Sequence, residues 1–182
     1  MADERGLRAD ARRNRERVLE VAAEVFAAEG LSVPVHEIAR RAGVGTGTVS
    51  RHFPAKEDLF AAILRTRLEE LTAEAAELAK REDPGTAFFA FFAALVREGA
   101  AHSGLADLAG ADFKLDALAG CAGADVCGSL EELLVSAQKA GAVRSDVVYA
   151  DISALLNGCM ARRGGPLEPI IDVISEGLRA KP

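Results

Sequence analysis

The sequence predicts an all-α protein with a small N-terminal head and a larger helical body. Alanine, leucine, glutamate and arginine dominate its 182 residues, tryptophan is absent and tyrosine occurs once, a composition that favours helices over sheets. Apolar residues recur at spacings of three and four, and glycine and proline interrupt this pattern at intervals. We therefore expect about nine helices joined by short breaks.

Three short or medium helices are expected before residue 55. The first is predicted over residues 12–29, ending at Gly30, with an apolar stripe of Val18, Ala22, Val25 and Phe26. The second has Pro34 as its first residue and ends at Gly43, with an inner face of Ile38, Ala39 and Ala42. The third opens at Gly45 or Thr46 and runs to about His52, before the break at Pro54.

A long helix is expected next, from Lys56 to about Lys80. It keeps helical period for some 25 residues, or about 36 Å at 1.5 Å per residue. Glu57 and Asp58 in its first turn complement the helix dipole, although Ala55 is a poor capping residue. A helix of this length can bridge two lobes, so we expect domains over residues 1–55 and 56–182.

The remaining chain predicts a bundle of further helices. Asp83-Pro84-Gly85 opens one that runs to about Ala101, and helical segments over 105–113 and about 121–140 are interrupted by glycine. The last two helices, over 147–163 and 166–180, carry apolar stripes. A small body cannot bury all of these apolar residues alone, which predicts that both helices pair with a second copy of the chain through Leu155, Leu156, Ile170, Ile171 and Ile174.

Charge is distributed unevenly along the chain. The net charge of −6 argues at first against a nucleic-acid partner, because duplex binding depends on neutralising phosphates. However, residues 5–17 hold six arginines against two acidic residues, a local charge of +4, and residues 36–56 carry +3. Both basic segments lie in the first third, whereas the rest is acidic. This pattern suits a DNA-binding head and a body held away from DNA.

Residues 35–52 have the pattern of a helix-turn-helix. Ala39 is small where a second helix must approach, Gly43 can take the left-handed conformation of the turn, and Val44 can fill the space beneath it. The outer face of the following helix is polar, small or basic, so it can approach base edges and phosphates. That face consists of Thr46, Gly47, Thr48, Ser50, Arg51 and His52.

Two stretches, EIARRAGV from Glu37 and TGTVSRHFPAKEDLF from Thr46, resemble the TetR family of transcriptional repressors. The resemblance is close over residues 13–64 and extends to the rest only in helix count and length. It implies base contacts by Thr46, Gly47 and Thr48 and phosphate contacts by His52 and Lys56, with Arg51 in either role. Ser50 departs from the tyrosine that the family often carries, and Ala55 from its usual helix cap. His36 is either a surface residue or a phosphate contact, and the arginines of 12–17 are either a solvated face or neighbours of the DNA backbone.

The resemblance also implies a function. The expectation is a cytoplasmic homodimer, a repressor released from a palindromic operator by a small-molecule effector. The alternative is a DNA-binding dimer without such an effector, acting architecturally or through a protein partner. Four residues are candidates for an effector pocket in the body: Phe88, Phe92, Phe113 and Asn157.

Other classes of protein are disfavoured. His36, His52 and His102 have no metal-ligand spacing, and no nucleophile, zincin or phosphate-loop motif occurs, so neither an enzyme nor a metal or other cofactor is expected. The cysteines at 121, 127 and 159 are odd in number and form no paired C-x-x-C motif, which indicates neither a disulfide framework nor a zinc site. There is no apolar run of 18 residues and no signal-peptide pattern, so no membrane partner is expected.

Overall fold

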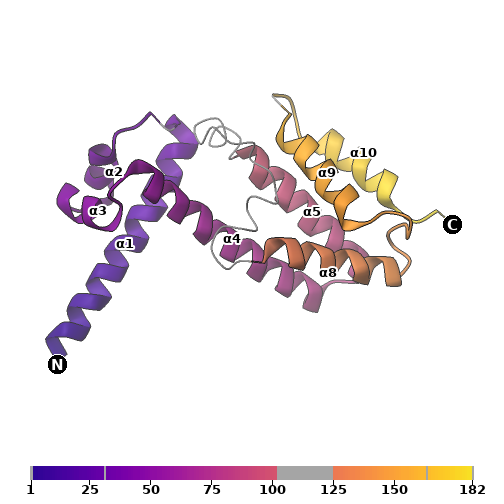
Figure 1. The fold of residues 1–182 in the computed structure, drawn as a ribbon, viewed down its shortest axis with the longest axis horizontal. Helices are drawn as coiled ribbons and strands as arrows, with labels where there is room; N and C mark the ends of the chain where they lie inside the picture. Colours follow the sequence, from indigo (N-terminus) through magenta and orange to yellow (C-terminus); the bar gives the residue numbers. More distant parts are fainter. Residues whose placement is uncertain (1, 31, 102–124, 163, 182) are drawn as a thin grey trace. The chain divides into compact units, whose positions relative to one another are not determined.

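The computed structural model describes residues 2–30, 32–101, 125–162 and 164–181 (Figure 1). These residues form eight helices and one isolated β-bridge, which confirms the predicted all-α fold. The chain divides into two compact units, Met1–Thr66 and Arg67–Pro182, so that helix α4 (Lys56–Arg81) contributes its first turns to one unit and the remainder to the other. No helix within the described ranges is both long and apolar enough to cross a membrane.

The N-terminal unit packs α1 (Ala2–Glu29), α2 (Val35–Ala42) and α3 (Thr46–His52) with the beginning of α4. The predicted apolar stripe of α1 is buried, and it meets the predicted inner face of α2 together with Val49, Phe53 and Leu59. Apolar residues that recur at helical spacing lie on one side of each helix. The helices pack together because these sides meet in one core.

Helix α1 starts ten residues before the predicted position, at Ala2 instead of Arg12. The apolar stripe marks only the packed part of a helix, and it begins at Val18. The preceding segment is rich in alanine, arginine and glutamate, which have high helix propensity, and it carries the pairs Arg13–Asp10 and Arg12–Glu16 at helical spacing. Propensity and side-chain pairing therefore favour a helix in the residues that precede the buried stripe.

The helix ends follow the predicted breaks with small differences. Pro34 is the residue before α2 and not its first helical residue. Gly30 and Gly43 have φ values of 76° and 65°, a left-handed conformation that glycine adopts without a Cβ clash. The poor cap at Ala55 is compensated from within α4, because Asp58 accepts a hydrogen bond of 2.9 Å from the Ala55 backbone N–H.

The C-terminal unit surrounds α5 (Pro84–Ala101), which contacts α8 (Val126–Lys139), α9 (Tyr149–Met160) and α10 (Glu168–Leu178) (Figure 1). Phe88, Phe91 and Phe92 of α5 have no exposed surface. Asp83 caps α5 by accepting from the N–H groups of Gly85 and Thr86, each at 3.1 Å, which explains why the helix starts there.

The last two helices are shorter at both ends than the predicted 147–163 and 166–180. After α10 the chain is held by an antiparallel bridge between Val143 and Arg179, with a 2.9 Å bond from the Arg144 N–H to the Leu178 carbonyl. The predicted helix over 105–113 lies outside the described residues, as does the first part of the helix predicted from about 121.

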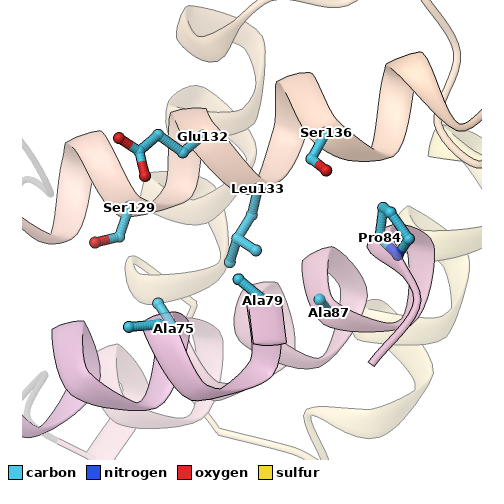
Figure 2. Close-up of a pocket in the computed structure, with 9 residues that line it drawn as sticks. Ala75, Ala79, Pro84, Ala87, Ser129, Glu132, Leu133 and Ser136 are labelled. Atoms are coloured by element: carbon cyan, nitrogen blue, oxygen red, sulfur yellow. The ribbon is translucent and has the colours of Figure 1, made fainter. Parts of the chain in front are cut away.

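Small side chains leave a pocket of about 240 Å³ where α4 and α5 approach α8 (Figure 2). Alanine methyl groups and Pro84 form one side, and Leu133 points toward Ala79 from the opposite helix. The α8 side also carries polar groups, namely Ser129, Glu132 and Ser136. The pocket exists because the alanines of α4 and α5 and the serines of α8 are small, and larger side chains at these positions would fill it.

Candidate nucleic-acid interface and ligand pocket

Helix α3 has one buried anchor and an otherwise open surface. Val49 has no exposed surface and packs in the core of the N-terminal unit. The predicted contact residues are on the outside of the helix: Thr48 is half-exposed, and Thr46, Gly47, Ser50, Arg51 and His52 are exposed. A Cβ built at Gly47 meets no heavy atom within 4 Å, so no described neighbour requires glycine there. The face therefore has the geometry of a helix available to a partner.

The turn before α3 is tight and is held from α1. The Val44 N–H donates to the Ala39 carbonyl at 3.0 Å, and the Thr48 N–H donates to the Gly45 carbonyl at 2.9 Å. Arg17 Nε donates to the carbonyl of Ala42, the last residue of α2, at 2.8 Å. A Cβ at Gly43 would come within 2.5 Å of the Arg17 guanidinium. Arg17 thus stabilises the turn that sets the position of α3.

Two more cations of the N-terminal unit have structural contacts. Lys56 Nζ donates to the Val33 carbonyl at 2.7 Å and lies 5.6 Å from the centroid of the Phe26 ring. The Arg15 guanidinium lies 5.4 Å from the Phe53 ring centroid. Sequence reasoning missed these contacts, although Arg15 lies three residues before the buried Val18, at the edge of the packed stripe. Lys56 therefore belongs to the fold as well as to the predicted phosphate contacts.

The two predicted histidine contacts are at the surface. His36 is exposed in the first turn of α2, and His52 is exposed at the end of α3, its ring 6.2 Å from that of Phe53. Phosphate contact by these two histidines remains a prediction, because exposure permits a contact but does not identify the partner.

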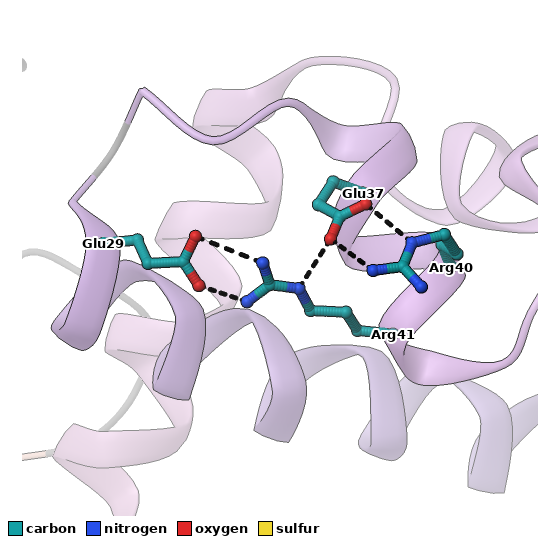
Figure 3. Close-up of polar contacts among 4 residues, drawn as sticks. All are labelled: Glu29, Glu37, Arg40 and Arg41. Atoms are coloured by element: carbon teal, nitrogen blue, oxygen red, sulfur yellow. Dashed lines mark hydrogen bonds and ion pairs between the residues drawn. The ribbon is translucent and has the colours of Figure 1, made fainter.

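A network of charges joins the end of α1 to α2 (Figure 3). Arg41 pairs with both oxygens of Glu29 and donates to Glu37 at 2.8 Å, and Arg40 donates to the same Glu37 carboxylate at 2.8 and 2.7 Å. Bonds from Arg40 and Arg41 lower the pKa of Glu37 to about 2. Spacings of three and four residues could have predicted the pairs within α2, but no sequence signal indicates Glu29 as the partner from α1.

Glu37→Gln should show the contribution of this network through its pH dependence. Because the folded-state pKa of Glu37 is lowered, its contribution is complete above the unfolded-state pKa near 4.5 and is lost as pH falls toward about 2. We expect the variant to melt at a lower temperature than the parent at pH 7. The difference should shrink below about pH 4.5. Thermal melts followed by circular dichroism from neutral to acid pH measure this, and a difference that is constant with pH would contradict the assignment.

Each of the two units contains a segment that matches a known protein family. Residues 18–63 match the family model of bacterial regulatory proteins of the TetR family, and residues 83–180 match the C-terminal domain model of SbtR-like transcriptional regulators. The chain belongs to the TetR family. It is a TetR-family transcriptional regulator with an N-terminal helix-turn-helix, as the residues from Glu37 to Phe60 predicted.

Several TetR-type regulators of known structure resemble this chain along most of its length. One from Mycobacterium vanbaalenii is 48% identical, with a TM-score of 0.74, over 96% of this chain and 99% of that one. One from Streptomyces coelicolor is 30% identical, with a TM-score of 0.71, over 92% and 99%. An HTH-type transcriptional regulator from Staphylococcus aureus is 38% identical over 64 residues, a segment that spans only 35% of this chain and 35% of that relative.

The pocket of Figure 2 is not lined by Phe88, Phe92 or Asn157, three of the four residues predicted to line an effector pocket in this TetR-family chain. Phe88 and Phe92 have no exposed surface, and their ring centroids lie 6.3 Å apart. Asn157 is half-exposed and donates to Ser153 Oγ at 3.4 Å, and Phe113 lies outside the described residues. All four remain predictions, and the first two are core residues in this conformation.

The residues predicted to form the dimer interface of the TetR-family chain differ in exposure. Leu156 and Ile171 are buried within the C-terminal unit itself, so their burial requires no partner. Leu155, Ile170 and Ile174 keep exposed surface. Sequence reasoning missed Val173, which is 71% exposed, because it is adjacent to the stripe and not part of it. In the parts of the chain that the structure describes, no group of three or more metal-ligating side chains occurs.

Proposed function

We propose that this TetR-family chain is a repressor that binds a palindromic operator as a homodimer and is released by a small-molecule effector. The observation that carries the proposal is α3, which is anchored by the buried Val49 at a tight turn and exposes a polar, basic face. A helix of this kind can enter the major groove, where side chains reach base edges.

Each residue of the proposed contact surface suits a particular contact. The hydroxyl groups of Thr46 and Thr48 can donate to or accept from base edges, and Gly47 allows the backbone to approach closely. Arg51 can form bidentate hydrogen bonds to a guanine or a phosphate. His52 and Lys56 are assigned to phosphates, with Ser50 and His36 at the margin of the contact surface.

The proposed dimer uses the exposed apolar surface of α9 and α10. Val173 projects into solvent beside the half-exposed Ile170 and Ile174, and Leu155 adds to this surface from α9. Gly158 and Gly177 on the same two helices have open space where a Cβ would lie, which permits close approach of another helix. A two-fold partner would cover these residues and present two copies of α3 to two half-sites.

The proposed effector site is the pocket between α4, α5 and α8. Its apolar wall and the adjacent Glu132 carboxylate and serine hydroxyls suit a small apolar compound that carries one positive charge. Residues 67–182 contain 11 basic and 18 acidic residues, a net charge of −7, so the field of this unit attracts cations. Access to Phe88 and Phe92 would require the helices to move apart, whereas this pocket needs no rearrangement.

Gly47→Ala tests the role of α3 directly. We expect a changed base preference at the pair that faces residue 47, by about 1–3 kcal/mol, because the added methyl group occupies space at the base edge. The fold should be no less stable, since a Cβ there meets no neighbour. Binding to operators with single base changes measures the preference, and a thermal melt checks the fold.

The contrasting variant is Lys56→Ala. It should weaken binding to every sequence alike and also lower the melting temperature, because Lys56 bonds to the Val33 carbonyl. If Gly47→Ala has the same base preference as the parent, the proposal that α3 reads base edges is contradicted.

A further inference from the structure

Helix α1 contacts the chain at both ends of α3. Before α3, Arg17 Nε donates to the Ala42 carbonyl at 2.8 Å, next to the turn that leads into the helix. After α3, the Arg15 guanidinium lies 5.4 Å from the ring centroid of Phe53, the residue that follows the helix. Val18 directly follows Arg17 and is buried in the core, so both arginines belong to a packed part of α1.

Arg17 supports the turn between α2 and α3 from outside it. Ala42 is the last residue of α2, and the final carbonyl groups of a helix have no partner within that helix. A guanidinium at this end also complements the negative end of the helix dipole. A Cβ at Gly43 would come within 2.5 Å of the same guanidinium, which therefore lies directly against the backbone of the turn. Removal of the guanidinium would give this backbone more freedom.

Helix α3 depends on such support because it is short. Of its seven residues, all of which the structure describes, Val49 is the one that is buried. A helix anchored at one point can tilt about that point unless its ends are also held. Hydrogen bonds to base edges form only within about 2.7–3.2 Å between heavy atoms, so a small tilt of α3 would weaken them.

We propose that Arg15 and Arg17 are positioning residues for base recognition, which fix the orientation of α3 by holding its two ends against α1. Their role is indirect, through the Phe53 ring and the Ala42 carbonyl, and requires no contact between either arginine and DNA. This inference rests on the proposed function, since the orientation of α3 matters for recognition only if α3 reads base edges.

The main test is Arg17→Met, which keeps the length of the side chain and removes its charge and its donors. A single base change in each half-site of the selected palindrome should weaken binding of the parent by about 5- to 150-fold. In Arg17→Met this factor should fall by about 2- to 10-fold, the equivalent of one hydrogen bond. The slope of log Kobs against log salt should stay unchanged, because no phosphate contact is lost. Fluorescence anisotropy with the full chain measures both quantities, and circular dichroism checks the fold.

Arg15→Met tests the other end of α3 and keeps the proposal testable if Arg17→Met does not fold. It should also lower the discrimination factor at an unchanged salt slope, because the cation that lies against the Phe53 ring is removed. Glu37→Gln is the matched control for stability, because it removes a charge network between α1 and α2 in the same unit without touching either end of α3. This variant should keep the discrimination factor of the parent.

Three results would overturn the proposal. In the first, the arginine variants fold and discriminate between bases as well as the parent. In the second, the salt slope falls in magnitude by about 0.9 per protomer while discrimination is unchanged, because the arginine would then bind a phosphate directly. In the third, Glu37→Gln loses as much discrimination as Arg17→Met, because general stability would then be the cause. A parent that does not discriminate between duplexes contradicts the proposed function instead.

Discussion

Val173→Glu is expected to convert the protein from a dimer to a monomer and to weaken operator binding by about 10²- to 10⁴-fold, the range by which linked binding exceeds binding at a single site. Val173 is 71% exposed, so a charge there costs the isolated chain little. In a two-fold interface the same carboxylate would be buried without a partner. Light scattering measures the mass, and fluorescence anisotropy with a labelled operator measures the affinity.

Val135→Glu on α8 is the matched control, because Val135 is 40% exposed and lies outside the proposed interface. It should remain dimeric and keep its operator affinity. A parent protein that is monomeric at micromolar concentration, or a Val173→Glu variant that remains dimeric, would contradict the assignment of the interface to α9 and α10.

Binding of a small organic cation is expected to weaken operator binding by about 5- to 150-fold, which corresponds to a coupling free energy of about 1–3 kcal/mol. The probe is phenethylamine, which is protonated at neutral pH and carries an apolar ring. Helix α4 supplies residues to both units, so a ligand against Ala75 and Ala79 acts on the same helix whose first residue is Lys56. Linkage requires the operator to weaken phenethylamine binding by the same factor.

Calorimetric titrations with and without operator measure this coupling, with Glu132→Gln as the variant that removes the carboxylate beside the pocket. The variant should bind phenethylamine more weakly and keep its operator affinity. Saturable binding with equal affinity in both titrations would favour the alternative of a DNA-binding dimer without an effector. Equal binding by the parent and Glu132→Gln would show that the pocket of Figure 2 is not the site.

The core of the N-terminal unit was predictable because the sequence patterns that indicate it are local. Ile38, Ala39 and Ala42 are spaced so that they must share one side of a helix, and the structure buries all three. Gly43 precedes a new helical segment, and the structure gives it the left-handed conformation that ends α2. Periodicity and turn chemistry act over a few residues, so a single sequence reveals them.

Contacts between distant residues were not predictable in the same way. The sequence shows that Arg17 is basic, but its bond to the Ala42 carbonyl depends on how α1 crosses α2. The pairing of Arg41 with Glu29 has the same origin. Likewise, Leu156 and Leu155 share one predicted stripe, and only the packing of α9 determines that the first is fully buried while the second keeps exposed surface.

Selection of binding sites from random duplexes by the purified protein tests whether this TetR-family chain recognises a specific DNA sequence as a dimer. We expect enrichment of one palindrome with two half-sites whose centres lie about one helical turn, or a multiple of it, apart. Enrichment of no sequence, or of a single unrepeated half-site, would contradict it.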